Sequence, residues 1–234
     1  MSTLYLLSSP IGNLEDVSAR FLRHLGETEY LLVEDVHKAL TLLQGLSKRY
    51  STLDISKKKL IPYRRENEYM KVGEVVGILD EGKNVALLTD AGVPAVSDPG
   101  SILVSSLKRS GHTIEIVPGP SALTAALAVC GFDAGVVSFI AFLPKKENDI
   151  RRLLEKVLND ALRNQLLVFF ESPKRIRETV AILKKMTPES TLFLGRELTK
   201  INEELLWSKL KELDEQTLSE KGEYVGVLSY KKML

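Results

Sequence analysis

Residues 85–100 read VALLTDAGVPAVSDPG and contain two kinds of sequence in succession. The first five residues, 85–89, are apolar or β-branched, and a short continuous run of that kind predicts a strand buried on both faces. The next eleven include two glycines and two prolines, which end the strand because glycine permits positive φ and proline removes a backbone donor. In open α/β sheets, such a loop at the carboxyl end of a buried strand is where small molecules bind. An ordinary turn into a helix, capped by 97–99, is the alternative interpretation.

The same alternation of strand and helix patterns covers the first 117 residues. Short apolar runs predict further strands at 4–7, 30–33, 60–62 and 113–117. Apolar positions three or four apart predict helices at 16–25, 38–46, 68–80 and 99–109. Strands that alternate with helices indicate an α/β domain, with a parallel sheet, helices on both of its faces and right-handed crossovers.

The sequence Pro118-Gly119-Pro120 marks the predicted boundary between two domains, 1–117 and 118–234. Beyond it the strand and helix patterns no longer alternate regularly, which predicts a second α/β domain with a mixed sheet. Strands are expected at 136–143, 166–170, 191–194, 203–207 and 224–230. Helices are expected at 122–130, 150–162, 174–186 and 208–219.

The composition is that of an ordinary globular protein, with 44% hydrophobic and 27% charged residues among 234. The one cysteine, Cys130, excludes a disulfide framework and fits a reducing compartment, so we expect a cytoplasmic protein. The three histidines are scattered without ligand spacing, so no metal site is expected. The apolar segment 121–143 is interrupted by the sequence GFDAG at 131–135, which leaves pieces too short to cross a bilayer.

The formal net charge of +1 conceals an uneven distribution of charge. Residues 144–200 contain 13 Lys or Arg against 8 Asp or Glu, whereas the remainder contains 19 against 23. A basic region in a nearly neutral protein can attract a polyanion such as RNA. Solvated helix faces produce the same imbalance, and the charge count does not separate the two interpretations.

Several common catalytic motifs do not occur in the sequence. It contains no G-x-x-x-x-G-K-[ST] phosphate loop, no G-x-G-x-x-G dinucleotide motif and no G-x-S-x-G nucleophile elbow. The remaining signal is a set of polar, Gly- and Pro-rich strand-end segments at 9–13, 34–35, 90–98 and 118–121. In a parallel sheet these segments meet at one edge, where backbone N–H groups and a helix N-terminus near Ser121 suit a carboxylate or a phosphate.

Seven motifs in fixed order carry a family resemblance. The chain reads SPIGNLED at 9–16, TDAGVPAVSDPG at 89–100, PGPSA at 118–122, FLPKK at 142–146, ESPKR at 171–175, RELTK at 196–200 and GE at 222–223. These motifs resemble TPIGNLxD, SDAGTPLISDPG, PGP[SC]A, GFLPxK, EAPHR, RELTK and GE of the bacterial small-subunit ribosomal RNA cytidine 2′-O-ribose methyltransferases. That family belongs to the tetrapyrrole methylase superfamily, and the chain is identified as a member of it.

The resemblance implies a homodimer that holds S-adenosylmethionine in a cleft between the two domains. By position in the motifs, the implied cofactor-binding residues are Pro10, Asp90, Gly92, Val93, Pro94, Val96, Ser121, Ala122, Phe170 and Leu198. The residues of this list from Pro10 to Ala122 lie in or next to the strand-end loops, so the residue pattern also favours them as binding residues without the resemblance. For Phe170 and Leu198, packing in the core explains the residue type equally well.

The resemblance also implies a ribose acceptor in small-subunit ribosomal RNA or in the 30S subunit. A ribose hydroxyl needs a base to remove its proton, and we expect Glu197 and Lys200 to lie near it, with Glu34, Asp35 and Asp98 as other candidates. The implied phosphate contacts are Arg64, Arg65, Lys145, Lys146, Arg151, Lys174 and Arg175.

Two segments depart from the family pattern. The chain has EDVH at 34–37 in place of EDTR, and RREN at 64–67 in place of HEHN. Two alternative functions stay open, the first because the superfamily also methylates tetrapyrroles and the second because of these departures. One is C-methylation of a tetrapyrrole precursor of cobalamin or sirohaem, which needs no basic face. The other is a non-catalytic RNA-binding or ribosome assembly factor that keeps only the fold.

Overall fold

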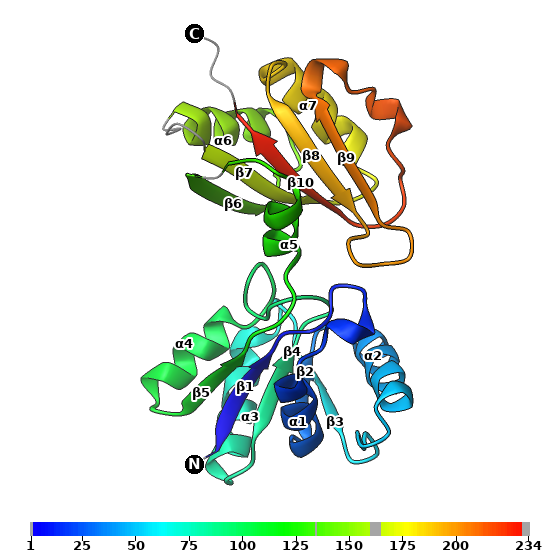
Figure 1. The fold of residues 1–234 in the computed structure, drawn as a ribbon. Helices are drawn as coiled ribbons and strands as arrows, with labels where there is room; N and C mark the ends of the chain where they lie inside the picture. Colours follow the sequence, from blue (N-terminus) through cyan, green and yellow to red (C-terminus); the bar gives the residue numbers. More distant parts are fainter. Residues whose placement is uncertain (1, 134, 160–164, 231–234) are drawn as a thin grey trace. The chain divides into compact units, whose positions relative to one another are not determined.

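The computed structural model describes residues 2–133, 135–159 and 165–230. Contacts between residues divide the chain into two compact units, Met1–Ser121 and Ala122–Leu234, which we call the first unit and the second unit. The division falls four residues after the predicted boundary between 117 and 118. Each unit is built on its own five-stranded sheet (Figure 1).

The sheet of the first unit is parallel throughout. Its strands lie in the order β3 (Lys59–Pro62), β2 (Tyr30–Val33), β4 (Val85–Leu88), β1 (Thr3–Leu7) and β5 (Thr113–Val117). All four residues of β4 are buried, as the apolar run at 85–89 predicts. Because every strand runs in the same direction, the loops that follow them all leave at one edge of the sheet.

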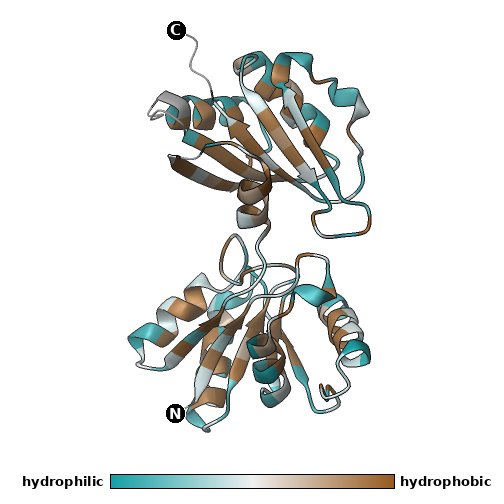
Figure 2. Ribbon diagram, viewed as in Figure 1, coloured by the Kyte–Doolittle hydropathy of each residue, from teal (hydrophilic) through white to brown (hydrophobic). Residues whose placement is uncertain are grey.

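Helices cover both faces of this sheet, and each face has its own apolar core. α1 (Ala19–Glu27) and α2 (Val36–Arg49) pack on the face that includes Ala86 and Leu88. α3 (Glu68–Asp80) and α4 (Ser101–Arg109) pack on the face that includes Val85 and Leu87. Successive residues of β4 thus point into opposite cores, which explains why the whole strand is apolar. The colouring by hydropathy in Figure 2 shows the apolar strands between helices whose outer sides are polar.

The sheet of the second unit is mixed. Its order is β6 (Val136–Phe142), β7 (Gln165–Glu171), β10 (Tyr224–Ser229), β8 (Thr191–Arg196) and β9 (Glu204–Lys209). β6 and β7 are parallel, and the other neighbouring pairs are antiparallel. The α/β class predicted for both halves, with a parallel sheet followed by a mixed one, is confirmed.

One core fills the space between this sheet and two helices, α6 (Glu147–Asn159) and α7 (Ile176–Met186). It joins Leu154 of α6 and Leu183 of α7 to Leu167 and Leu192 of the strands. A shorter helix, α5 (Ala122–Val129), opens the unit and contacts β10. In the described part of the chain, no helix is long and apolar enough to cross a membrane, and the apolar segment at 121–143 is divided between α5 and β6.

The helix predicted at 208–219 is wrong. β9 continues to Lys209, and two single-turn 3-10 helices follow, Leu210–Glu212 and Glu215–Thr217. The Leu210 amide donates to the Ser190 carbonyl (3.0 Å) and the Lys211 amide donates to the Pro188 carbonyl (3.0 Å). These bonds tie the segment to a distant loop and interrupt a continuous helix, and the leucines that suggested a helical face enter the core from separate turns.

Two glycines allow a matched test of packing. A Cβ at Gly226 in β10 would overlap the ring of Phe169, whereas a Cβ at the exposed Gly73 of α3 would meet nothing within 4 Å. We expect Gly226→Ala to lower the free energy of unfolding by roughly 1–3 kcal/mol through overpacking. Gly73→Ala should raise it by roughly 0.5–1 kcal/mol, because alanine favours the helix. Urea denaturation of both variants measures the difference, and equal effects would contradict the packing described here.

Candidate functional site

The loops that follow β1 and β4 are joined by their backbones. The Ser9 amide donates to the Gly92 carbonyl (2.8 Å), and the Gly92 amide donates back to the Ser9 carbonyl (3.1 Å). The Thr89 hydroxyl donates to the same Gly92 carbonyl (3.3 Å) from the end of β4. These bonds fix the start of the segment 90–100 at the carboxyl edge of the sheet.

The segment 90–100 follows an unusual backbone path. Ala95 and Ser97 adopt positive φ angles of 63° and 69°, a region that side chains other than glycine occupy at a cost of about 1–3 kcal/mol. Gly100 has φ 137°, and a Cβ there would come within 2.7 Å of Leu87 Cδ2. Such strain persists only where the surrounding structure enforces it, so this loop has one defined shape rather than that of a simple helix cap. α4 begins at Ser101, and its N-cap residue is Gly100. The alternative interpretation, in which residues 97–99 cap this helix, is therefore wrong.

The loop after β5 approaches the end of β1 closely enough to require a glycine. A Cβ at Gly119 would lie 2.9 Å from Ser8 Cβ and 3.1 Å from the Ser8 carbonyl oxygen. The Ser8 amide donates to the Val117 carbonyl (3.3 Å). The hydroxyls of Ser8 and Ser9 are buried and have no hydrogen-bond partner within the described residues. A buried hydroxyl without a partner costs free energy unless a ligand satisfies it.

The sequence-predicted cofactor residues fall in both units. Pro10, Gly92 and Pro94 are buried in the joined loops, Val93 and Ser121 are half-buried, and Val96 is 47% exposed. Asp90 forms an ion pair with Lys38 (Nζ to Oδ2, 2.7 Å). In the second unit, Ala122 and Phe170 are half-buried and Leu198 is buried. Phe170 packs edge-on against Phe139 and Phe142, with ring centroids 5.1 and 5.9 Å away.

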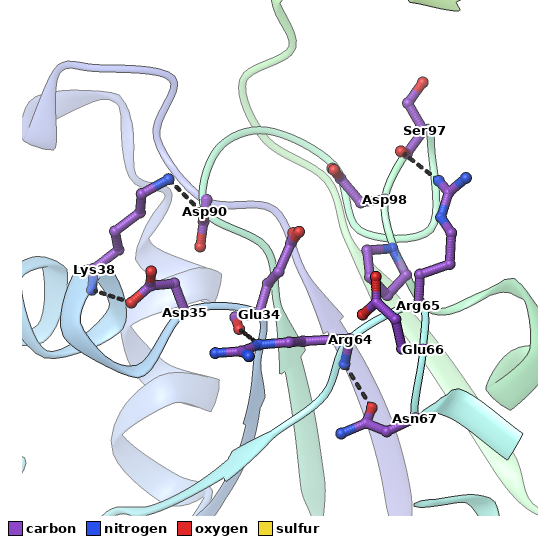
Figure 3. A pocket seen from close by; sticks show the side chains of 11 residues that line it. Glu34, Asp35, Lys38, Arg64, Arg65, Glu66, Asn67, Asp90, Ser97 and Asp98 are labelled. Atoms are coloured by element: carbon purple, nitrogen blue, oxygen red, sulfur yellow. Dashed lines mark hydrogen bonds and ion pairs between the residues drawn. The ribbon is translucent and has the colours of Figure 1, made fainter. Parts of the chain in front are cut away.

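In the first unit, a cavity of about 810 Å³ lies beside the joined loops, at the ends of β2 and β3 and next to residues 97–99 (Figure 3). Its walls carry charged groups of both signs. The carboxylates are Glu34, Asp35, Glu66, Asp90 and Asp98. The cations are Lys38, Arg64 and Arg65. Among the described residues, no three His, Cys, Asp or Glu side chains are grouped as metal ligands.

The two arginines of the cavity hold its rim together. Arg64 Nε donates to the Glu34 carbonyl (3.0 Å), and Arg65 Nη2 donates to the Ser97 carbonyl (3.1 Å). The Arg64 amide donates to Asn67 Oδ1 (2.7 Å). Through these bonds the loop after β3 is tied both to the end of β2 and to the strained segment after β4.

The carboxylates of the cavity differ in their surroundings. Asp35 caps α2, and the backbone amides of Lys38 and His37 hold its pKa below the ordinary value. Burial raises the pKa of Glu34, and the neighbouring Asp90 adds to the shift. Burial raises the pKa of Asp98 to about 6, reinforced by Glu34 and Asp90 and opposed by Arg65. A carboxyl group with that pKa can exchange a proton near neutral pH.

Glu197 and Lys200 form a compact ion-paired turn after β8. Lys200 Nζ lies 2.8 Å from Glu197 Oε1 and 2.8 Å from Glu223 Oε2. The Glu223 amide also donates to Glu197 Oε1 (2.9 Å), so Glu197 connects the end of β8 to the start of β10. Burial favours the neutral acid, but the bonds from Lys200 and the Glu223 amide outweigh it and lower the pKa of Glu197. A carboxylate held in its charged form in this way is a weak base.

The predicted RNA-binding residues of the second unit fall into two groups. Lys145, Lys146 and Lys174 are exposed. Arg175 instead donates to the Leu143 and Pro144 carbonyls (3.2 and 2.5 Å). Arg175 thus helps to hold the turn that follows β6.

Two further contacts complete this part of the second unit. Arg175 Nη1 lies 3.5 Å from the buried Glu171 carboxylate, to which the Thr179 hydroxyl also donates (2.7 Å). Arg151 pairs with Glu147 one turn earlier on α6 (2.8 Å). The structure thus gives Arg175 and Arg151 intramolecular partners.

Sequence reasoning did not identify the buried hydroxyls of Ser8 and Ser9 as site groups, nor the cavity that Lys38 shares with the acids. Both depend on contacts between loops that are far apart in the chain. The available signal was position alone, because every one of these residues follows closely on a strand of the parallel sheet.

Comparison with known proteins gives a family match and near-full-length relatives. The family model described as Tetrapyrrole (Corrin/Porphyrin) Methylases matches residues 3–214. A protein of Thermotoga maritima named Ribosomal RNA small subunit methyltransferase I is 38% identical over 234 residues, which cover 99% of this chain and 100% of the relative. A protein of the same name from Coprothermobacter proteolyticus is 39% identical over 225 residues, 96% of each chain.

Solved structures share the fold at low sequence identity. The methyltransferase CobJ superposes with a TM-score of 0.69 at 17% identity, over 100% of this chain and 98% of that one. Uroporphyrin-III C-methyl transferase from Thermus thermophilus, complexed with S-adenyl homocysteine, has a TM-score of 0.65 at 17% identity, over 97% of both chains. At such identities the likeness concerns the fold alone.

The ion-paired turn predicts a pH-dependent contribution to stability. Because the pKa of Glu197 is lower in the folded chain than its ordinary value of 4.5, its contribution is complete above that value and is lost as pH falls through the folded pKa. We expect Glu197→Gln to lower the free energy of unfolding by roughly 1–2 kcal/mol at pH 7, and by much less at pH 3. Urea denaturation at both pH values measures this, with Glu155→Gln, an exposed carboxylate of α6, as control. A deficit equal at both pH values would refute the assignment.

Proposed function

The chain belongs to the tetrapyrrole (corrin/porphyrin) methylases, and from that premise we propose that it is an S-adenosylmethionine-dependent methyltransferase. Its proposed acceptor is the 2′-hydroxyl of a cytidine ribose in small-subunit ribosomal RNA. One observation carries the proposal: the relatives named Ribosomal RNA small subunit methyltransferase I are 38% and 39% identical over nearly the whole chain. The methyltransferase CobJ and the uroporphyrin-III C-methyl transferase are each 17% identical to this chain, which favours RNA over a tetrapyrrole as substrate.

The joined loops of the first unit fit a polar small molecule such as S-adenosylmethionine. The buried hydroxyls of Ser8 and Ser9 lack partners within the described residues, and a ligand would satisfy them. The residues proposed to hold the methyl donor are Ser8, Ser9, Pro10, Asp90, Gly92, Val93, Pro94, Val96, Ser121, Ala122, Phe170 and Leu198. When bound, S-adenosylmethionine supplies an electrophilic methyl group on a sulfonium.

The protein's own contribution is to position the acceptor and to manage its proton. Alignment of the ribose oxygen about 3–3.5 Å from the methyl carbon can supply much of the rate enhancement. Because the pKa of Glu197 is held low, its proposed part is to orient Lys200 beside the RNA rather than to remove the proton. Exposed cations at Arg64, Arg65, Lys145, Lys146 and Lys174, together with Arg151 and Arg175, are proposed to contact phosphates, which position RNA without reading its sequence.

The remaining proposals concern assembly and location. We propose that the protein acts in the cytoplasm on the small subunit or its RNA, and that it forms a homodimer. Exposed apolar side chains on β6, namely Val136, Val137 and Phe142, favour a protein partner for that strand. Light scattering of the purified protein measures the oligomeric state.

The methyl-transfer proposal predicts incorporation of label into ribose. Small subunits from a strain that lacks this protein should accept a tritiated methyl group from S-adenosylmethionine, and nuclease digestion should recover it as a 2′-O-methylated cytidine. Fully methylated subunits are the control and should accept little. A protein that binds S-adenosylmethionine but labels no ribose would contradict the RNA proposal. A protein that binds none would leave only the scaffold function.

The buried hydroxyls predict effects of opposite sign on stability and on binding. Ser9→Ala removes an unsatisfied polar group, so the free protein should be as stable as wild type or slightly more so. Its dissociation constant for S-adenosylmethionine should rise by about 5- to 30-fold, which corresponds to a loss of about 1–2 kcal/mol of binding free energy. Isothermal titration and thermal unfolding measure the two effects. Thr28→Val is the matched control, because the Thr28 hydroxyl is also buried without a partner among the described residues but precedes β2 at the opposite edge of the sheet. Equal loss of affinity in both variants would refute a direct contact.

A further inference from the structure

Two carboxylates of the cavity, Asp98 and Glu34, have no hydrogen bond or ion pair with the described residues. Asp98 lies in the segment after β4, and Glu34 lies at the end of β2. Figure 3 shows the Glu34 side chain extending toward Asp98 from this separate element. Within the described residues neither carboxylate has a hydrogen-bond donor or an ion-pair partner, although both line a cavity that also contains three cations.

The position of Asp98 is fixed by the backbone on both sides. Ser97 adopts a positive φ of 69°, and its carbonyl accepts a hydrogen bond from Arg65 Nη2 (3.1 Å). Gly100 packs against Leu87, so that no side chain fits there. A carboxylate held by strained backbone rather than by hydrogen bonds of its own is placed in advance and remains able to accept a proton. Rigid placement of that kind is typical of catalytic groups.

The charges around Asp98 are unequal. Glu34 and Asp90 face it as negative charges and Arg65 as a positive one, while Lys38 is engaged with Asp90 (2.7 Å). Glu66 and Arg64 line the same cavity from the loop after β3. Burial and the two acids together raise the pKa of Asp98 to about 6. A base is most effective when its pKa lies near the working pH, and Asp98 meets that condition while Glu197 and Asp35 do not.

We propose that the Asp98 carboxylate is the base that accepts the proton of the ribose 2′-hydroxyl, and that Glu34, which lines the same cavity, is a positioning residue. This inference rests on the proposed function and assigns the cavity to the acceptor nucleotide. Its volume of about 810 Å³ leaves room for a nucleoside, and Arg64 and Arg65 stand at its rim to meet the flanking phosphates.

The step balances with these groups alone. The ribose 2′-oxygen forms a bond to the methyl carbon while the carbon–sulfur bond breaks, and that electron pair returns to sulfur to give a neutral thioether. The hydroxyl proton passes to Asp98 Oδ. The carboxylic acid so formed releases the proton to solvent after the product leaves, because its pKa of about 6 lies below neutral pH.

The test combines kinetics with a direct titration. The variants are Asp98→Asn, Asp98→Glu and Glu34→Gln, with Glu74→Gln, a surface carboxylate of α3, as the control. Asp98→Asn should lower kcat by about 100-fold or more with little change in KM, and Asp98→Glu should recover part of the loss. The wild-type rate should decrease as the pH is lowered below about 6, which gives the pH–rate profile an acidic limb. Glu34→Gln should move that limb to lower pH, because the substitution removes a negative charge that favours protonated Asp98. Carbon-13 NMR of the free protein should show the Asp98 carboxyl titrating near pH 6 and moving in the same direction in Glu34→Gln.

Each outcome supports or overturns the assignment. The inference is overturned if Asp98→Asn keeps the wild-type rate, or if the acidic limb does not move in Glu34→Gln. In either case, methyl transfer by the wild type leaves the proposed function intact. A normal titration of Asp98 near pH 4 overturns it without any measurement of activity. Absence of methyl transfer by the wild type overturns the proposed function, and this inference with it.

Discussion

The parallel alignment of β2, β4 and β1 between two apolar cores is the constraint on which the candidate site depends. Each of these strands is buried on both faces, so its direction and register are set by packing that involves no functional residue. All their carboxyl ends therefore meet at one edge. The reciprocal hydrogen bonds between Ser9 and Gly92 then join two of the loops that leave there.

Charge is used differently in the two units. In the second unit Glu197 and Lys200 satisfy one another, and Arg175 is bound to carbonyls and to the buried Glu171, so these charges hold loops together. In the first unit Glu34 and Asp98 are left without such partners within the described residues, in a cavity whose cations bind elsewhere. Paired charges give up their capacity to exchange protons near neutral pH, whereas half-buried carboxylates without an ion pair gain it. The contrast favours the first unit as the place where the proton of the acceptor is removed.

Most elements were predictable because their apolar spacing is regular. The run at 85–89, for example, lies within one residue of β4. The helix at 208–219 was not predictable, because Leu210 and its neighbours bond to the loop before β8, which local spacing does not contain. Among the site residues, the motifs located the loop at 90–98 but could not distinguish Asp98, which lacks a hydrogen-bond partner within the described residues, from Asp90, which pairs with Lys38.

The sequence by itself determined the α/β class, the order of most elements and the family, because all of these follow from periodic apolar positions and from motifs that are contiguous in the chain. Only the tertiary structure decided which polar groups lack partners and which acids share a cavity. The physical reason is that burial and pairing are properties of neighbours in space. The neighbours of Asp98 come from β2, from the loop after β3 and from its own loop, and no local stretch of sequence contains all three.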